Sequence, residues 1–320
     1  MVSHKKLLFL IILLVAVFTA IHFIPEKQTA DISEIKNKKI IVTATIFPVY
    51  DVAKYIIGER GSVKMMLPPG IEPHSYEPTP KDIINLKKSK IFLYSSQYME
   101  SWVEKIIPQI SKNCVVVNGS EGVIFINSAM HEEDEHEMSI HKGVDPHIWM
   151  DPENMKIIAE NFAEALIKEE PANADYYLIR LDNYKKQMNE LDKEIRETVE
   201  KFKNKTIIYG GHYAFGYFSK KYGLNYVSPY KNFSPNSDPA PKDIKEMIDT
   251  IKSTKAKYIF YEEMLSPKIA EIASKECQVS LLMLNGAHNV SKDDLSAGIT
   301  YIEIMRKNLE NLKKGLDSIE

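Results

Sequence analysis

The chain has 320 residues, of which 44% are hydrophobic and 27% charged, so it can build a sizeable core and is neither a disordered chain nor a coiled-coil rod. Nine histidines against two cysteines exclude a cysteine-built zinc finger and a disulfide-dense scaffold, and leave imidazole as the plentiful metal ligand. The formal net charge of -3 offers no attraction to a polyphosphate, so we expect no nucleic-acid partner.

The first thirty residues have the pattern of an export signal. Two lysines precede an apolar run, residues 7–18, which continues to Ile24. Because the basic end stays in the cytoplasm, we expect the rest of the chain on the extracytoplasmic face of the cell membrane. Cleavage after Ala20 would give a secreted form. We favour an uncleaved helical anchor, because the run reaches the length of a short transmembrane helix and no clear small-x-small site follows it.

Short β-branched runs alternate with helical stretches along the remaining chain. They lie at residues 39–45, 63–67, 91–95, 114–118, 206–209, 257–261 and 279–284. Such alternation is typical of parallel α/β sheets. The runs form two groups separated by residues 172–203, whose apolar side chains recur at three- and four-residue steps and predict one helix of ~45 Å. We therefore predict an α/β fold with two lobes, each a parallel sheet flanked by helices, joined by one long rigid helix.

Helix-start signals help to place the boundaries between these parts. Asp151 can cap a helix that has Pro152 at its first position, and Thr79 opens a second helix with a capping-box pattern. The predicted parts are a signal or anchor segment (1–30), an N-terminal lobe (31–170), a linking helix (171–204) and a C-terminal lobe (205–320).

Histidines follow several of the predicted strands. In open α/β sheets ligands bind beyond the carboxyl ends of the strands. Glu72 and His74 follow the second run, and His212 follows the run at 206–209, so the two histidines are expected at equivalent places in the two lobes. His147 comes just before the capped helix and can face the same cleft.

Three histidines on separate loops, with a further donor near a fourth position, match the imidazole-rich sphere that Zn²⁺ prefers and that Mn²⁺ or Fe²⁺ tolerates. The candidates for the fourth position, as ligands or as partners of the ligands, are Glu262, Asn285, His288 and Glu72. Gly210 and Gly211 precede His212 and would let the backbone approach a small ligand.

One compositionally biased segment, residues 131–141, reads HEEDEHEMSIH and includes His131, His136 and His141. It has no apolar periodicity, so we expect a loop. The functional interpretation is a low-affinity collector of metal near the main site. The alternative is a solvated insertion whose charge keeps it soluble.

Several segments resemble the zinc- and manganese-binding solute-binding proteins of metal ABC transporters, and the resemblance extends from Ile41 to Leu316. The most specific segments are TIFPVYDVAKYI, PPGIEPHSYEPTPKDI, DPHIWMDPENM, GGHYAFGYFSKKYGL, SDPAPKDIKEMIDTIK, YIFYEEMLSPKIAEIASK and YIEIMRKNLENLKKGL. The resemblance implies a metal held between two lobes and delivered to a membrane permease that a separate ATPase powers. It also implies that His74, His147 and His212 are ligands and that the protein is not an enzyme.

The chain departs from the family pattern in two places. Asn285 stands where members of the family often have an aspartate at the end of the last strand, so water, Glu262, Glu72 or His288 would complete the sphere. Three imidazoles and a missing anion favour Zn²⁺ over Mn²⁺, which prefers oxygen ligands. The export segment also has no cysteine to carry a lipid, so attachment to the membrane differs from that of lipoprotein members.

Two alternative functions use the same residues. In a zinc hydrolase the open fourth position would activate water, with Glu262 or Glu263 as general base, although the chain has no H-E-x-x-H motif. A metal-binding surface adhesin could share the fold. Cys114 and Cys277 fall in or beside strands of different predicted lobes, and we expect them to be separate buried thiols.

Overall fold

A computed structural model describes residues 39–110, 112, 114–127, 143–231, 233, 238–264 and 266–317. The predicted export segment, 1–30, and the acidic loop, 131–141, lie outside the described residues. From Ile40 onward the chain forms one compact unit. No helix in the described part is long and apolar enough to cross a bilayer. Parallel sheets flanked by helices confirm the predicted fold class.

The N-terminal lobe is built on a four-stranded parallel sheet in the order β2-β1-β3-β4. Its strands are β1 (Ile40–Ala44), β2 (Gly61–Met65), β3 (Ile91–Tyr94) and β4 (Val115–Asn118). The helices α3 (Phe47–Ile57), α4 (Pro80–Leu86) and α5 (Val103–Ile106) connect successive strands. Parallel neighbours require such crossovers. The β3 residues are all buried, as expected for a strand covered on both faces.

The C-terminal lobe repeats this strand order. Its strands are β5 (Thr206–Ile208), β6 (Asn225–Val227), β7 (Tyr258–Glu262) and β8 (Ser280–Leu284), and its connecting helices are α8 (Gly216–Tyr222), α9 (Pro241–Thr254) and α10 (Lys268–Cys277). The parallel pairs β5-β6 and β7-β8 are joined by a parallel bridge between Tyr209 and Phe260, which gives the order β6-β5-β7-β8. The sequence patterns did not predict β6.

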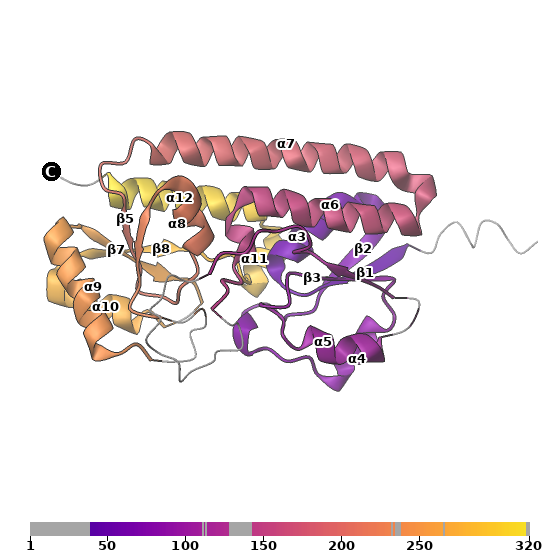
Figure 1. The fold of residues 1–320 in the computed structure, drawn as a ribbon, viewed down its shortest axis with the longest axis horizontal. Coiled ribbons are helices and arrows are strands. Elements are labelled where there is room, and N and C mark those ends of the chain that lie inside the picture. Colours follow the sequence, from indigo (N-terminus) through magenta and orange to yellow (C-terminus); the bar gives the residue numbers. More distant parts are fainter. Residues whose placement is uncertain are drawn as a thin grey trace, which may run out of the picture. The chain divides into compact units, whose positions relative to one another are not determined.

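Two helices run beside the long predicted helix. Helix α7 (Ala174–Val199) has 26 residues and is ~39 Å long, and it packs along α6 (Pro152–Glu169) and α12 (Tyr301–Leu316) (Figure 1). Arg306 of α12 forms an ion pair of 3.0 Å with Glu194 of α7. Helix α12 therefore lies against the linking helix and supports it.

The predicted helix starts are confirmed. The Asp151 side chain accepts from the backbone N–H of Glu153 with Pro152 at the first position of α6, and Thr79 and Asp82 form a capping box at the start of α4. The remaining elements are α11 (Lys292–Ala297) and the 3-10 turns Gly58–Arg60, Pro73–Ser75, Ile107–Gln109, Ile148–Met150 and Pro171–Asn173. Both cysteines are free thiols, as predicted, but only Cys114 is buried; Cys277 is partly exposed, so the prediction of burial was wrong for it.

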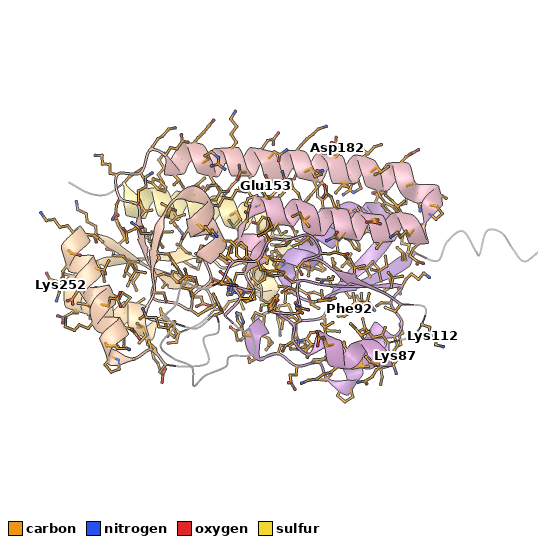
Figure 2. The ribbon with its side chains drawn as sticks, viewed as in Figure 1. Lys87, Phe92, Lys112, Glu153, Asp182 and Lys252 are labelled. Carbon is orange, nitrogen blue, oxygen red and sulfur yellow. The ribbon has the colours of Figure 1, made fainter. Side chains whose placement is uncertain are left out.

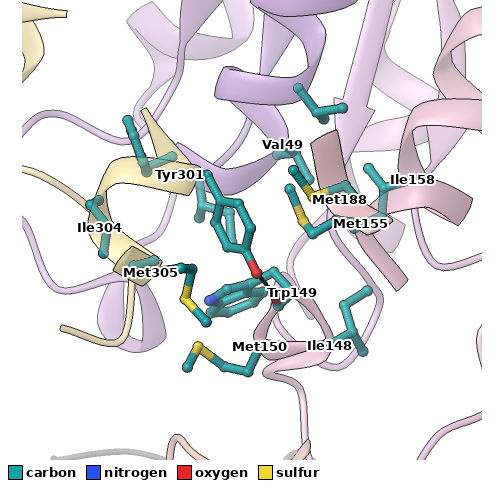
Figure 3. Packing of buried hydrophobic residues seen from close by; sticks show 14 of the residues in the cluster. Val49, Ile148, Trp149, Met150, Met155, Ile158, Met188, Tyr301, Ile304 and Met305 are labelled. Atoms are coloured by element: carbon teal, nitrogen blue, oxygen red, sulfur yellow. Dashed lines mark hydrogen bonds between the residues drawn. The ribbon is translucent and has the colours of Figure 1, made fainter. Parts of the chain in front are cut away.

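The core contains residues from both lobes and from the helices between them. Trp149, Tyr301, Met188 and Met305 belong to one buried cluster, in which the Tyr301 hydroxyl donates to the Trp149 carbonyl at 2.6 Å (Figure 3). Charged side chains, such as those of Asp182 and Lys252, lie at the surface, whereas Phe92 is fully buried (Figure 2). One buried apolar cluster therefore includes residues of both lobes.

Candidate metal centre

Four imidazoles converge between the two sheets. One ring nitrogen from each of His74, His147, His212 and His288 lies within 4.8 Å of the others. The Nε2 atom of His147 is 3.2 Å from Nε2 of His74 and 3.2 Å from Nε2 of His212, and Nε2 of His212 is 3.2 Å from Nε2 of His288. Three of the rings are buried and His74 is partly exposed, so His74 marks the solvent side of the cluster.

His74 is presented by a short, capped turn after β2. The residue lies in the 3-10 turn Pro73–Ser75, and its backbone N–H donates to the Glu72 side chain at 2.7 Å. Pro73 fixes the backbone at the start of the turn. Glu72, one candidate for the fourth position, therefore caps the turn that carries His74.

His147 is paired with a carboxylate that the sequence analysis missed. Asp145 Oδ1 accepts from the backbone N–H of His147 at 2.9 Å and lies 2.8 Å from the ring Nδ1. Asp145 is 1% exposed. The available signal was the spacing D-P-H, which places a carboxylate two residues before the imidazole.

His212 is paired with Glu262 at the end of β7. The Nδ1 atom of His212 lies 2.8 Å from the carboxylate, which also accepts the backbone N–H of His212 at 3.1 Å. A Cβ at Gly211 would lie 2.6 Å from Glu262 Oε2, and one at Gly210 would lie 2.7 Å from Ala270. The glycines therefore make room for Glu262 and for helix α10. The interpretation that they admit a small ligand was wrong.

His288 supplies the fourth imidazole of the cluster. Its Nδ1 lies 3.4 Å from Oε1 of Glu263, whose other oxygen accepts from the Gly286 N–H at 2.8 Å. Asn285 instead turns its side-chain oxygen toward its own loop, where it accepts from the Ala287 N–H at 2.7 Å. The structure thus brings His288, but not Asn285, into the cluster with His74, His147 and His212.

The two lobes do not present His74 and His212 at equivalent places. His74 follows β2, an edge strand, whereas His212 follows β5, an inner strand of its lobe. A linear sequence shows that a residue follows a strand, but the position of that strand in the sheet depends on non-local pairing. His131, His136 and His141 of the predicted collecting loop lie outside the described residues.

The carboxylates orient the rings. A carboxylate at Nδ1 fixes the tautomer in which Nδ1 carries the proton, so the lone pair of Nε2 is free to bind a metal. Asp145, Glu262 and Glu263 stand in this position toward His147, His212 and His288. Their Nε2 atoms are the atoms that face one another.

Burial and neighbouring charge shift the pKa values of these groups, and at His288 the two effects oppose each other. Burial, followed by proximity to His288, lowers the pKa of His212 to about 3, so this imidazole is neutral. Burial alone would lower the pKa of His288, but the hydrogen bond and charge of Glu263 raise it above its usual value. Burial, and then the charge of Glu263, raises the pKa of Glu262 to about 8. A dication between the rings would favour the ionised form of the carboxylates behind them and would be stabilised by that charge.

Comparisons with known proteins show which family the chain belongs to. A family model described as the zinc-uptake complex component A, periplasmic (ZnuA), matches residues 42–315. The chain belongs to this family. ZnuA-family proteins are solute-binding proteins of transporters and are not enzymes, so the hydrolase alternative loses its support.

Several relatives of the ZnuA family cover most of the chain. The high-affinity zinc uptake system protein ZnuA of Bacillus subtilis is 33% identical over 296 residues, which cover 90% of this chain and 91% of that protein. The zinc-binding protein AdcA of Streptococcus pyogenes is 31% identical over 98% of this chain, which spans 62% of AdcA. The crystal structure of the Zn(II)-bound ZnuA-like domain of Streptococcus pneumoniae AdcA has a TM-score of 0.74 at 27% identity, covering 88% of this chain and 100% of that domain.

Proposed function

We propose that this ZnuA-family protein captures Zn²⁺ at His74, His147, His212 and His288 and delivers it to an ABC-type importer. The observation that carries the proposal is the convergence of four imidazole nitrogens within 4.8 Å of one another between the two sheets. The four histidines come from separate segments of the two lobes. The permease and its cytoplasmic ATPase are the partners that the family implies.

The chemistry of the ligands supports Zn²⁺ over Mn²⁺ or Fe²⁺ as the cargo. Four nitrogen donors provide the four-coordinate sphere that Zn²⁺ favours, whereas Mn²⁺ prefers oxygen-rich sites. The carboxylates near the cluster are engaged with His147, His212 and His288. They therefore supply negative charge around the cation while the imidazoles supply the donor atoms.

Zinc titration of the purified protein in competition with a chelating dye tests the proposal. His74→Ala, His147→Ala, His212→Ala and His288→Ala should each weaken binding, because each removes one ligand. Asn285→Ala serves as the matched comparison for the fourth position and should weaken binding less than His288→Ala. Equal zinc affinity in the wild-type protein and all four histidine variants would refute the assignment.

We propose that the site works on the extracytoplasmic face of the cell membrane. The apolar run in residues 1–30 supports export, and our preferred form of attachment is an uncleaved helix. Mass spectrometry of the protein extracted from membranes tests this, because an intact N-terminus in the membrane fraction is expected. A mature chain that begins after Ala20 and is found in the medium would show the secreted form instead.

The proposal also gives the bounds of the two lobes and a role for the acidic loop, residues 131–141. The lobes are residues 31–170 and 205–320, with 171–204 linking them, and both contribute ligands. His131, His136 and His141 collect zinc for the main site. Deleting residues 131–141 should leave the equilibrium affinity of the main site unchanged and slow growth in zinc-depleted medium, and normal growth of that strain would contradict the collecting role.

A further inference from the structure

The segment that carries His288 is hydrogen-bonded to the loop that leads to His74. The Asn289 side-chain amide donates to the carbonyls of Pro68 at 2.8 Å and Ile71 at 2.9 Å. In the same place, the backbone N–H of Gly70 donates to the carbonyl of Val290 at 3.1 Å. These bonds join residues more than two hundred positions apart in the sequence and connect the C-terminal part of the chain to the N-terminal lobe.

The Asn289 side chain is buried within this contact. Its side chain is 1% exposed, and its oxygen accepts from the backbone N–H of Val290 at 2.8 Å. The loop that it holds is exposed at Pro68, Gly70 and Ile71. Because an exposed loop buries little apolar surface, its conformation depends strongly on hydrogen bonds of this kind.

Short stretches of chain connect the contact to two imidazoles of the cluster. Asn289 directly follows His288, and Ile71 precedes His74 by three residues. Between Ile71 and His74 the path is stiff, because Pro73 fixes its own backbone angle and Glu72 caps the turn through the His74 N–H. A shift at Ile71 is therefore transmitted to the His74 ring.

We propose that Asn289 is a positioning residue of the metal site. It fixes the position of the partly exposed His74 relative to the buried His288. Its amide fixes two ligands from different lobes as a pair. Loss of the amide removes two of the three bonds described above and so loosens the His74 loop, and it leaves the other three imidazoles in place. The bound metal then has a weaker fourth bond on the solvent side. This inference rests on the proposed function, since it assumes that the imidazoles bind Zn²⁺.

Two variants remove the contact in different ways. Asn289→Asp keeps the shape of the side chain but places a carboxylate oxygen against two carbonyls in place of the N–H donors. Asn289→Ala removes the amide without adding charge and keeps the inference testable should the charged variant fail to fold. Asn161→Asp is the matched control, because the Asn161 amide also donates to backbone carbonyls, those of Asn118 at 3.5 Å, Gly119 at 3.0 Å and Glu121 at 2.9 Å, and none of these bonds involves the histidines.

The measurements are zinc affinity, the rate of zinc release to an excess of chelator, and the number of imidazoles bound, counted by X-ray absorption. The Asn289 variants should bind zinc about 10- to 100-fold more weakly, release it faster and show three imidazoles where the wild type shows four. Asn161→Asp should match the wild type in all three measurements. Asn289 variants that keep four imidazoles and wild-type affinity would overturn the inference.

A double-mutant cycle with His74→Ala separates positioning from a general structural effect. If Asn289 acts through His74, Asn289→Ala should have little further effect on zinc affinity once His74 is absent. An undiminished effect in the His74→Ala background would overturn the positioning role. Failure of the wild-type protein to bind Zn²⁺ would instead contradict the proposed function, so the two failures are distinguishable.

Discussion

Glu262 holds His212 through two contacts, one to the ring Nδ1 at 2.8 Å and one to the backbone N–H of the same residue at 3.1 Å. The two residues are 50 positions apart in the sequence. Glu262 is the last residue of β7, and His212 follows β5. Because β5 and β7 are adjacent through the Tyr209 bridge, their carboxyl ends meet. The neighbouring strands thus bring a carboxylate behind an imidazole and leave Nε2 directed toward His147 and His288.

Glu262→Gln should weaken zinc binding about 10- to 100-fold. The amide is nearly the same size as the carboxylate but has no negative charge to stabilise the bound dication, and its NH₂ group cannot accept from Nδ1–H. Competition with a chelating dye measures the change. Glu276→Gln is the matched control, because Glu276 is an exposed carboxylate on α10 that pairs with Lys252. Equal losses in both variants would contradict a specific role for Glu262.

Gly211→Ala should weaken zinc binding, because the new Cβ would lie 2.6 Å from the Glu262 carboxylate and 2.8 Å from its Cβ. Glu262 must then move away from His212. The neighbouring Gly210→Ala provides the comparison, since its Cβ would meet Ala270 of α10 and not a residue of the site. We expect Gly210→Ala to lower thermal stability with a smaller effect on zinc affinity. The reverse order of affinities would disprove this account.

Much of the fold could be predicted because the relevant signals are local. The apolar runs located seven of the strands in the described chain, and the capping signals at Thr79 and Asp151 located two helix starts. The rule that ligands follow strands selected His74 and His212, and the position just before the capped helix selected His147; the structure brings the three together. His288 was one of several candidates for the fourth position, because the loop after β8 had no local signal for which side chain turns inward.

The features that the sequence analysis missed depend on contacts between distant residues. The strand order that places His212 on an inner strand and His74 on an edge strand is set by pairing between strands. The bond from Asn289 to Pro68 spans 221 positions, and no pattern in either segment indicates it. Asp145 is the exception, because it lies two residues from His147. A short D-P-H spacing is too common to predict a pair.

Tyr301→Phe should lower the free energy of unfolding by about 1–3 kcal/mol. The Tyr301 hydroxyl donates to the Trp149 carbonyl at 2.6 Å inside the core, and the phenylalanine ring would fill the same space but leave that carbonyl without this donor (Figure 3). Urea unfolding of the metal-free protein measures the change. Tyr50→Phe, at a partly exposed tyrosine of α3, should change stability by less than about 0.5 kcal/mol. A Tyr301→Phe protein as stable as the Tyr50→Phe control would show that the buried bond contributes nothing.

Ionisation of the buried Glu100 should lower the free energy of unfolding as the pH rises. The side chain is 2% exposed and accepts from the backbone N–H groups of Ser95 and Ser96 and from the Thr45 hydroxyl. Burial raises the pKa of Glu100 from 4.5 to about 7, against the opposing effect of these hydrogen bonds. The folded state therefore binds a proton that the unfolded state releases between pH 4.5 and about 7. The stabilisation is complete below pH 4.5 and is lost as the pH rises through about 7.

The expected loss between pH 5 and pH 8 is about 2–3 kcal/mol of unfolding free energy from this group. Other groups titrate over the same range, so the measured quantity is the difference between the wild-type protein and Glu100→Gln. Gln cannot ionise, and its unfolding free energy should fall less between the two pH values than that of the wild type. Urea unfolding of the metal-free proteins at both pH values gives the comparison. Identical pH dependence would mean that Glu100 stays ionised in the folded protein, with its three donors outweighing the cost of burial.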